Sequence, residues 1–170
     1  RAYDKSGRMT RITDDLSQST DYVYDARGRL TKTIYSDHDA SGDEVVTLYA
    51  FSSNPYKRID QRGIETKYIY DGMGNLLTKQ DSWSSPTIVE AYAYDKAGRK
   101  TMAILANGGT TISDVRQYYD SANRLTRESQ QIRGGDVRNV DYGYNIAGNR
   151  TKLAYPGASR VVDYTYDAAN

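Results

Sequence analysis

A repeat of roughly 23 residues constrains the fold of this chain more than any other feature of its sequence. Each copy contains Tyr-Asp followed by a Gly three residues after the Asp, as in Tyr24-Asp25-Ala26-Arg27-Gly28. The repeat-motif residues are Tyr3, Asp4, Gly7, Tyr24, Asp25, Gly28, Tyr70, Asp71, Gly74, Tyr94, Asp95, Gly98, Tyr119, Asp120, Asn123, Tyr144, Asn145, Gly148, Tyr166 and Asp167. We also expect a degenerate copy from Phe51-Ser52, so that about seven repeats fill residues 1–170.

The motif predicts a strand, a tight turn and a returning strand. A second tyrosine often lies two residues earlier, as in Tyr22 and Tyr142, and this spacing places both rings on one face of a strand. The Asp begins a type I turn, and its carboxylate accepts from backbone N–H groups. The Gly then takes a positive φ in a three-residue loop with a bulge. Asn tolerates the same conformation, so we expect a positive φ at Asn123 as well.

A second, looser turn closes each repeat and makes the whole chain a series of hairpins. The candidate turns are at residues 14–15, 60–63, 84–86, 107–109, 133–135 and 156–157. No window has helical periodicity. The sequence therefore predicts an all-β fold, an antiparallel hairpin meander of about a dozen or more strands in a curved or spiral sheet.

Composition narrows the function. The 23 basic and 22 acidic residues nearly cancel, which disfavours electrostatic binding of nucleic acid. The length of 170 residues is enough for a domain with a sizeable core, and the 17 tyrosines are expected to supply much of its buried surface. The absence of cysteine excludes disulfides, zinc–thiolate sites and cysteine nucleophiles, and no apolar run reaches membrane-spanning length.

Candidate chemical groups are few. The repeated Asp residues could be catalytic carboxylates, but their place beside a turn Gly, and the change to Asn145, favour turn capping. The single His38 does not support a catalytic triad. Asp37, Asp39 and Ser41 match the first half of a calcium loop, but Leu48 stands where the loop requires Glu. We expect no catalytic residue and no cofactor, and calcium binding at residues 37–44 stays a hypothesis.

The pattern Tyr-x-Tyr-Asp-x-x-Gly-Arg-Leu-Thr resembles the repeats of the Rhs/YD-repeat family, and the resemblance covers essentially the whole chain. The family includes bacterial Rhs polymorphic toxins, the C components of insecticidal toxin complexes, wall-associated bacterial proteins and the animal teneurins. The resemblance implies a β-ribbon wound into a hollow shell, which in the toxins encloses a toxic effector polypeptide.

The family toxins end their shell with a self-cleaving segment that contains Asp-Pro, and this chain departs from that pattern. Its prolines are Pro55, Pro86 and Pro156, and none follows an Asp. The chain also starts without Met and ends within a motif, so we interpret it as a fragment of a longer polypeptide.

These features predict a non-enzymatic, secreted or cell-surface structural segment. Its partners are expected to be further YD repeats and an enclosed effector domain of the same polypeptide. The alternative is a cell-surface or adhesion module whose repeats bind a glycan, a receptor or another protein, because Tyr-rich stripes with Arg can stack on sugars.

Overall fold

The structure is a computed structural model that describes residues 1–36, 44–50, 52–81, 87–157 and 160–167. The described residues form fifteen strands and no helix. They divide into two compact units, Arg1–Thr87 and Ile88–Asn170. None of the described residues belongs to a helix long and apolar enough to cross a membrane.

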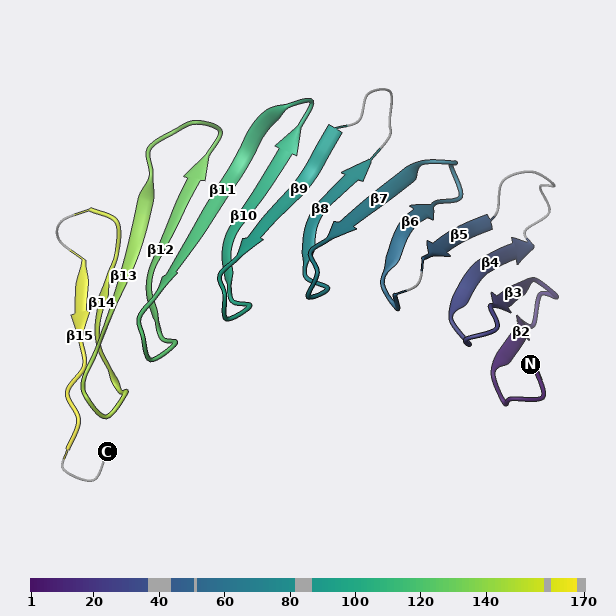
Figure 1. The fold of residues 1–170 in the computed structure, drawn as a ribbon, viewed down its shortest axis with the longest axis horizontal. Coiled ribbons are helices and arrows are strands. Elements are labelled where there is room, and N and C mark those ends of the chain that lie inside the picture. The colour runs from purple at the N-terminus through teal and green to yellow at the C-terminus, as the bar shows by residue number, and fades with distance from the viewer. Residues whose placement is uncertain (37–43, 51, 82–86, 158–159, 168–170) are drawn as a thin grey trace. The chain divides into compact units, whose positions relative to one another are not determined.

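The first unit is a meander of antiparallel strands in which each strand pairs with the next one in the chain. Figure 1 shows the Tyr-Asp turns along one edge of this unit and the connecting turns along the other. The strands are β1 (Ala2–Tyr3), β2 (Met9–Thr13), β3 (Ser19–Tyr24), β4 (Leu30–Ser36), β5 (Glu44–Tyr49), β6 (Pro55–Ile59), β7 (Glu65–Tyr70) and β8 (Leu76–Asp81).

The second unit has the same organisation, again with antiparallel pairing of consecutive strands and with its Tyr-Asp turns along one edge (Figure 1). Its strands are β9 (Thr87–Tyr94), β10 (Lys100–Asn107), β11 (Thr110–Tyr119), β12 (Leu125–Ile132), β13 (Arg138–Tyr144), β14 (Arg150–Ala154) and β15 (Val161–Asp163). The all-β hairpin meander predicted from the repeat is confirmed in both units.

One register recurs in every Tyr-Asp hairpin. The motif tyrosine pairs with the residue six positions later, as Tyr24 does with Leu30 and Tyr119 with Leu125. The register shifts at this point because the returning strand carries one extra residue, which is a β-bulge. Tyr49 pairs in the same way with Pro55, the residue six positions later. The degenerate copy therefore begins at Tyr49, and the expected start at Phe51 is wrong by two residues; Phe51 itself lies outside the described residues.

The expectation of a sizeable core is wrong for the part of the chain that the structure describes. None of the described side chains is fully buried, and most strand residues are partly exposed. The physical reason is the architecture, because a meander within one sheet leaves both faces open unless a second layer covers them. Side chains in each unit are therefore shielded from water mainly by neighbouring side chains on the same face of the sheet.

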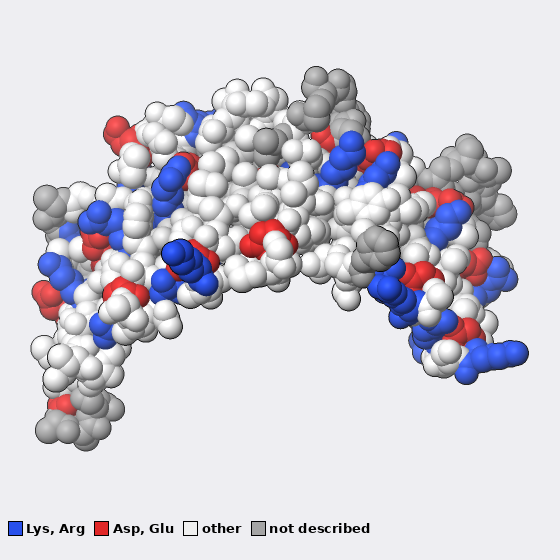
Figure 2. Space-filling view, viewed as in Figure 1, with Lys and Arg blue, Asp and Glu red and all other residues white. Residues whose placement is uncertain are grey.

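Acidic and basic side chains are interspersed over the visible surface of each unit, as Figure 2 shows. Ion pairs join several of them across neighbouring strands, such as Lys32 with Glu44 and Lys57 with Glu65, and Arg127 with Asp141 in the second unit. Opposite charges on facing strands stabilise the pairing.

Candidate functional site

The repeated turn is the best-defined arrangement of polar groups in the described residues. In the Asp25 turn, the amide of Gly28 donates to the carbonyl of Asp25 at 2.9 Å, and the amide of Asp25 donates to the carbonyl of Arg29 at 3.0 Å. Gly28 has a φ of 79°. These two bonds define the predicted three-residue loop with its left-handed third residue.

The Asp side chain fills the turn with hydrogen bonds. Its Oδ1 atom accepts from the amides of Arg27 and Arg29 at 2.9 Å each, and its Oδ2 atom accepts from Nε of Arg29 at 2.7 Å. The amide of Arg29 lowers the pKa of Asp25, and burial offsets part of this effect. A carboxyl group that is held in its charged form in this way carries no proton to donate at neutral pH, so it does not suit the role of a general acid.

The same cap is built at four other Tyr-Asp turns among the described residues. The carboxylates of Asp4, Asp71, Asp95 and Asp120 each accept from two backbone amides and from the side chain four residues later. Asn145 replaces Asp in one copy, and its Oδ1 atom still accepts from the amide of Asn149 at 2.9 Å. An amide thus makes part of the cap without a charge, which agrees with turn capping and not with a base.

Two of the connecting turns at the opposite edge of the first unit use this cap as well. Oδ1 of Asp14 accepts from the amides of Leu16 and Gln18, and Oδ1 of Asp60 accepts from the amides of Arg62 and Ile64. Ser17 has a φ of 64° and takes the place of the turn Gly after Asp14. The predicted turns at these positions are confirmed.

The predicted backbone conformation is confirmed at the motif Gly positions and at Asn123. The φ angle of Asn123 is 64°, and those of Gly7, Gly28, Gly74, Gly98 and Gly148 lie between 76° and 91°. Asn123 fits because its short polar side chain tolerates this region. Its Oδ1 atom also accepts from Nη1 of Arg99 at 2.7 Å.

In four copies the arginine of the motif connects its turn to the next repeat. Arg124 binds Oδ2 of Asp120 through Nε at 2.7 Å, and its Nη1 atom donates to the carbonyl of Asn145 at 3.0 Å. Its Cζ atom lies 4.8 Å from the centre of the Tyr144 ring. The Tyr144 hydroxyl in turn donates to the carbonyl of Leu125 at 2.8 Å. We name this set, one turn arginine with the motif tyrosine of the next repeat, the inter-repeat clasp.

The clasp recurs within both units. Arg99 stacks on Tyr119 at 4.6 Å, and the Tyr119 hydroxyl donates to the carbonyl of Lys100 at 3.2 Å. Arg8 lies over Tyr24, and Arg29 lies over Tyr49 and donates to the carbonyls of Ala50 and Ser52. Each clasp adds a cation–π contact and hydrogen bonds to the backbone pairing between consecutive hairpins.

Three copies carry Asn where the others have this Arg, namely Asn54, Asn75 and Asn149. Asn54 donates through Nδ2 to the carbonyl of Gly74 at 3.2 Å, so a shorter side chain still contacts the next turn. Asn75 donates to Oδ2 of its own Asp71 at 2.9 Å.

Sequence reasoning did not predict the contacts of the clasp arginines with the next repeat. The spacing carried the information, because Arg29, Arg99 and Arg124 each precede the tyrosine that they contact by 20 residues.

Pairs of tyrosines two residues apart interact electrostatically. Burial raises the pKa of Tyr70, and the nearby Tyr68 adds to the effect. The carboxylate of Glu90, which accepts from the Tyr92 hydroxyl, raises the pKa of Tyr92 to about 12, and burial and Tyr94 contribute. These contacts agree with a shared face for such pairs. For Tyr22 with Tyr24 and for Tyr142 with Tyr144, the shared face follows from their positions within β3 and β13.

The remaining candidate residues from the sequence are those of the calcium hypothesis and the single histidine. Asp37, Asp39 and Ser41 of the calcium hypothesis, and His38, lie outside the described residues. Leu48 lies in strand β5. Among the residues that the structure describes, no group of three or more His, Cys, Asp or Glu side chains is arranged to hold a metal ion.

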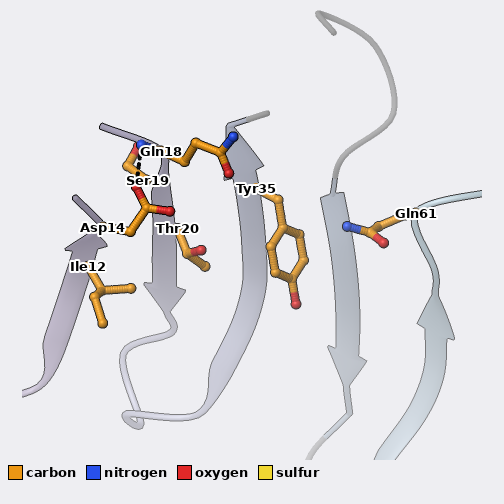
Figure 3. Close-up of a pocket in the computed structure, with 7 residues that line it drawn as sticks. All are labelled: Ile12, Asp14, Gln18, Ser19, Thr20, Tyr35 and Gln61. Carbon is orange, nitrogen blue, oxygen red and sulfur yellow. Dashed lines mark hydrogen bonds between the residues drawn. The ribbon is translucent and has the colours of Figure 1, made fainter. Parts of the chain in front are cut away.

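An open hollow of about 260 Å³ lies on the first unit (Figure 3). Ile12, Thr20 and Tyr35 form a row across three strands on one side of it, because Ile12 pairs with Thr20 and Thr20 pairs with Tyr35. Gln61, from the turn after β6, lies beyond Tyr35. The Asp14 carboxylate at its rim already caps its own turn, as the dashed line to Gln18 shows.

Comparisons with known proteins identify a repeat family and solved structures that this chain resembles. A sequence model of the RHS repeat matches residues 3–44. No curated protein has significant sequence similarity to the chain. The crystal structure of TcdB2-TccC3-Cdc42 has a TM-score of 0.66 over 95% of this chain, at 14% identity. TcdB2-TccC3 without its hypervariable C-terminal region gives 0.67 over 95%, at 16% identity.

A third similar structure is the Photorhabdus luminescens Tc holotoxin pore with a mutated TccC3, with a TM-score of 0.63 over 88% of this chain and 14% identity. This chain spans only 8–9% of the length of the chains that it matches in these three structures. At these identities the likeness concerns the fold. The RHS repeat matched at residues 3–44, the recurring Tyr-Asp-x-x-Gly-Arg turns and the fold of the similar structures all agree with the resemblance to the Rhs/YD-repeat family.

Proposed function

We propose that the chain is a structural wall segment of an Rhs/YD-repeat shell that encloses a toxic effector polypeptide of a secreted bacterial toxin. The observation that carries the proposal is the inter-repeat clasp, which fastens one hairpin to the next in a sheet without a buried core. The fold likeness to chains of TcdB2-TccC3 and of a Tc holotoxin pore supports the toxin context.

A wall needs strength along the direction in which the repeats succeed one another. Backbone pairing supplies part of this, since consecutive strands within each unit are hydrogen-bonded to one another. The clasp adds a second connection at the turn edge, where Arg124 contacts the Asp120 carboxylate, the Tyr144 ring and the Asn145 carbonyl. Repeat arrays gain stability from such nearest-neighbour contacts.

A wall around a polypeptide must also avoid binding that cargo too tightly. Charged and polar residues accompany apolar ones on the strands, as in Thr66-Lys67-Tyr68-Ile69 of β7. Such a surface offers hydrogen-bonding groups to a cargo beside its apolar side chains. We propose that this mixed surface lets an effector stay enclosed without folding against the wall.

The remaining expectations follow from the same proposal. Both units, residues 1–170, belong to one YD-repeat region, and the motif Tyr, Asp and Gly residues act structurally and not as catalysts. Its partners are further repeats and the effector of the same polypeptide, and its location is outside the producing cell.

The test is limited proteolysis with mass spectrometry on the polypeptide that carries these repeats, native and denatured. We expect a segment outside the repeats to resist cleavage in the native protein and to be cut once the sheet is denatured. Equal cleavage of every segment outside the repeats in both states would refute enclosure and would favour an exposed adhesion scaffold.

A pair of double variants connects that result to the clasp. Arg99→Met with Arg124→Met removes two clasps, whereas Arg116→Met with Arg127→Met removes two arginines that pair with Asp114 and Asp141. We expect the first pair to expose the enclosed segment sooner than the second. The same protection in both would show that the clasps do not maintain the wall.

A further inference from the structure

The turn that joins β10 to β11 contains the only asparagine of the sequence that is followed by a glycine. Asn107 pairs with Thr110, so the loop between them has two residues, Gly108 and Gly109. Their φ angles of 57° and 78° are both left-handed, as a type I′ hairpin turn requires. This turn lies at the edge opposite the Tyr-Asp turns of the second unit (Figure 1), and no part of the proposed wall function uses it.

Two reactive groups lie side by side in this turn without other partners. The side chain of Asn107 is exposed, and its carboxamide makes no hydrogen bond to another of the described residues. The amide nitrogen of Gly108 likewise has no hydrogen-bond partner within the described part of the chain. A Cβ atom at Gly108 would have no atom of a more distant residue within 4 Å, so nothing nearby blocks an approach to this nitrogen.

The end of this hairpin is held by few strand pairs. The register shifts between Leu105 and Ala106, and this β-bulge separates the last two strand pairs from the regular ladder. The outer of these pairs joins Asn107 to Thr110, and both residues are exposed. Local opening of such an end costs much less free energy than opening of the sheet. This opening lets Asn107 rotate about its Cα–C bond, which brings its side chain to the Gly108 nitrogen.

We propose that Asn107 is a site of spontaneous deamidation, in which the backbone nitrogen of Gly108 displaces the side-chain amide. The Gly108 nitrogen loses its proton to hydroxide and attacks Cγ of Asn107, and the new Cγ–N bond closes a five-membered succinimide ring. The Cγ–Nδ2 bond breaks, and Nδ2 takes a proton from water and leaves as ammonia. Water then opens the ring. Opening at Cγ gives aspartate, and opening at the main-chain carbonyl gives isoaspartate, in which the chain continues through Cγ.

Either product changes the end of the hairpin. Both add a negative charge at this edge, and isoaspartate also adds one methylene carbon to the backbone. The Asn107–Thr110 pair loses its register when the backbone lengthens, whereas the pairs from Met102 to Leu105 lie on the other side of the bulge and stay formed. The site uses only residues of the second unit, so this inference does not depend on whether the sheet encloses an effector.

Asn123 has the opposite surroundings at another turn of the same unit. It is also exposed, but its Oδ1 atom accepts from Nη1 of Arg99 at 2.7 Å. The amide nitrogen that follows it, that of Arg124, donates to Oδ1 of Asp120 at 2.9 Å. The carboxamide and the following amide are thus both engaged, and Arg124 carries a side chain that Gly108 lacks. Asn123 therefore serves as an internal control for the reaction.

The experiment is incubation of the native polypeptide that carries these repeats at pH 7 and at pH 9, followed by peptide mapping with mass spectrometry. Conversion is detected as the mass gain of an amide that becomes an acid, and isoaspartate is labelled by an isoaspartyl methyltransferase. The peptide with Asn107 should convert about tenfold faster or more than the peptide with Asn123, because Gly adds no side-chain hindrance and little backbone restriction. Conversion should be faster at pH 9, because the Gly108 amide must lose its proton.

Two matched variants separate the chemistry from the shape of the turn. Gly108→Ala places a side chain on the attacking residue, whereas Gly109→Ala places similar strain one residue later, at a φ of 78°, and leaves the Asn-Gly sequence intact. We expect Gly108→Ala to slow conversion about tenfold or more and Gly109→Ala not to slow it. The proposal is overturned if Asn107 converts no faster than Asn123, if the rate does not rise with pH, or if both variants slow conversion equally.

Discussion

The Tyr144 hydroxyl offers the sharpest test of the inter-repeat clasp. It donates to the carbonyl of Leu125 at 2.8 Å, while the ring of Tyr144 receives the Arg124 guanidinium at 4.8 Å. Tyr144→Phe deletes the hydrogen bond and keeps the ring. A neutral hydrogen bond contributes about 1 kcal/mol net, so local opening of the Asp120 turn should become about fivefold more frequent.

Tyr142→Phe is the matched control because it removes a hydroxyl from the same strand. Both tyrosines are partly buried, but the hydroxyl of Tyr142 makes no hydrogen bond to another of the described residues. We expect little change in the opening of the turn. The effect of Tyr144→Phe should therefore be specific to the clasp.

The ring contact is measured separately. Tyr144→Leu removes both the hydrogen bond and the cation–π contact, and the latter adds about 0.5–1 kcal/mol at a partly exposed site. A double-mutant cycle with Arg124→Met then isolates the coupling between the two side chains. A coupling near zero would mean that Arg124 and Tyr144 are neighbours without mutual stabilisation.

The assay is peptide-resolved amide hydrogen exchange, because it reports opening of individual turns and does not require the whole sheet to unfold in one step. Peptides that cover residues 119–126 and 143–150 report the two turns that the clasp connects. Equal exchange in Tyr144→Phe and Tyr142→Phe would refute the reasoning. So would faster exchange throughout the second unit with no focus on these turns.

Three further predictions follow from the turns. Gly98→Ala should destabilise its turn by about 1 kcal/mol or more, because an L-residue is strained at a φ of 78°. Gly28→Ala should destabilise its own turn further, since the added Cβ would lie 3.0 Å from Nη1 of Arg8. Hydrogen exchange of the two turns measures the difference, and equal effects would show that the Arg8 side chain moves away without cost. Asp120→Asn should retain more protection of its turn than Asp120→Ala, because Asn145 makes a similar cap in its own repeat, and the same exchange experiment decides between them. Stability should be constant near neutral pH and fall in acid, because folding lowers the pKa values of the Asp4, Asp25, Asp60, Asp71, Asp95 and Asp120 carboxyls. Their contribution is therefore present above the unfolded-state pKa and is lost as the pH falls through the folded-state values. Circular dichroism from pH 7 to pH 2 checks the sign, and a loss of structure on raising the pH instead would contradict it.

The local structure of this protein was readable from its sequence because each signal is short in range. A Tyr-Asp-x-x-Gly motif determines a strand end, a capped turn and a bulge within seven residues, so the hairpins, the positive φ of Asn123 and the capping role of Asp could be predicted. The degenerate copy was misplaced because its Asp and Gly are absent and only Tyr49, paired with Pro55, retains the register.

Contacts between repeats were beyond sequence reasoning, since they depend on which strand lies beside which. The partner of Arg124 on the next repeat, Tyr144, became visible only when pairing of β12 with β13 brought the two turns together. The absence of a fully buried side chain in the described residues was likewise unexpected, because composition reports how much apolar surface a chain has and not whether a second layer covers it. Tyrosine content and repeat period are properties of the sequence, whereas the clasp and the open faces are decided by the arrangement of strands in space.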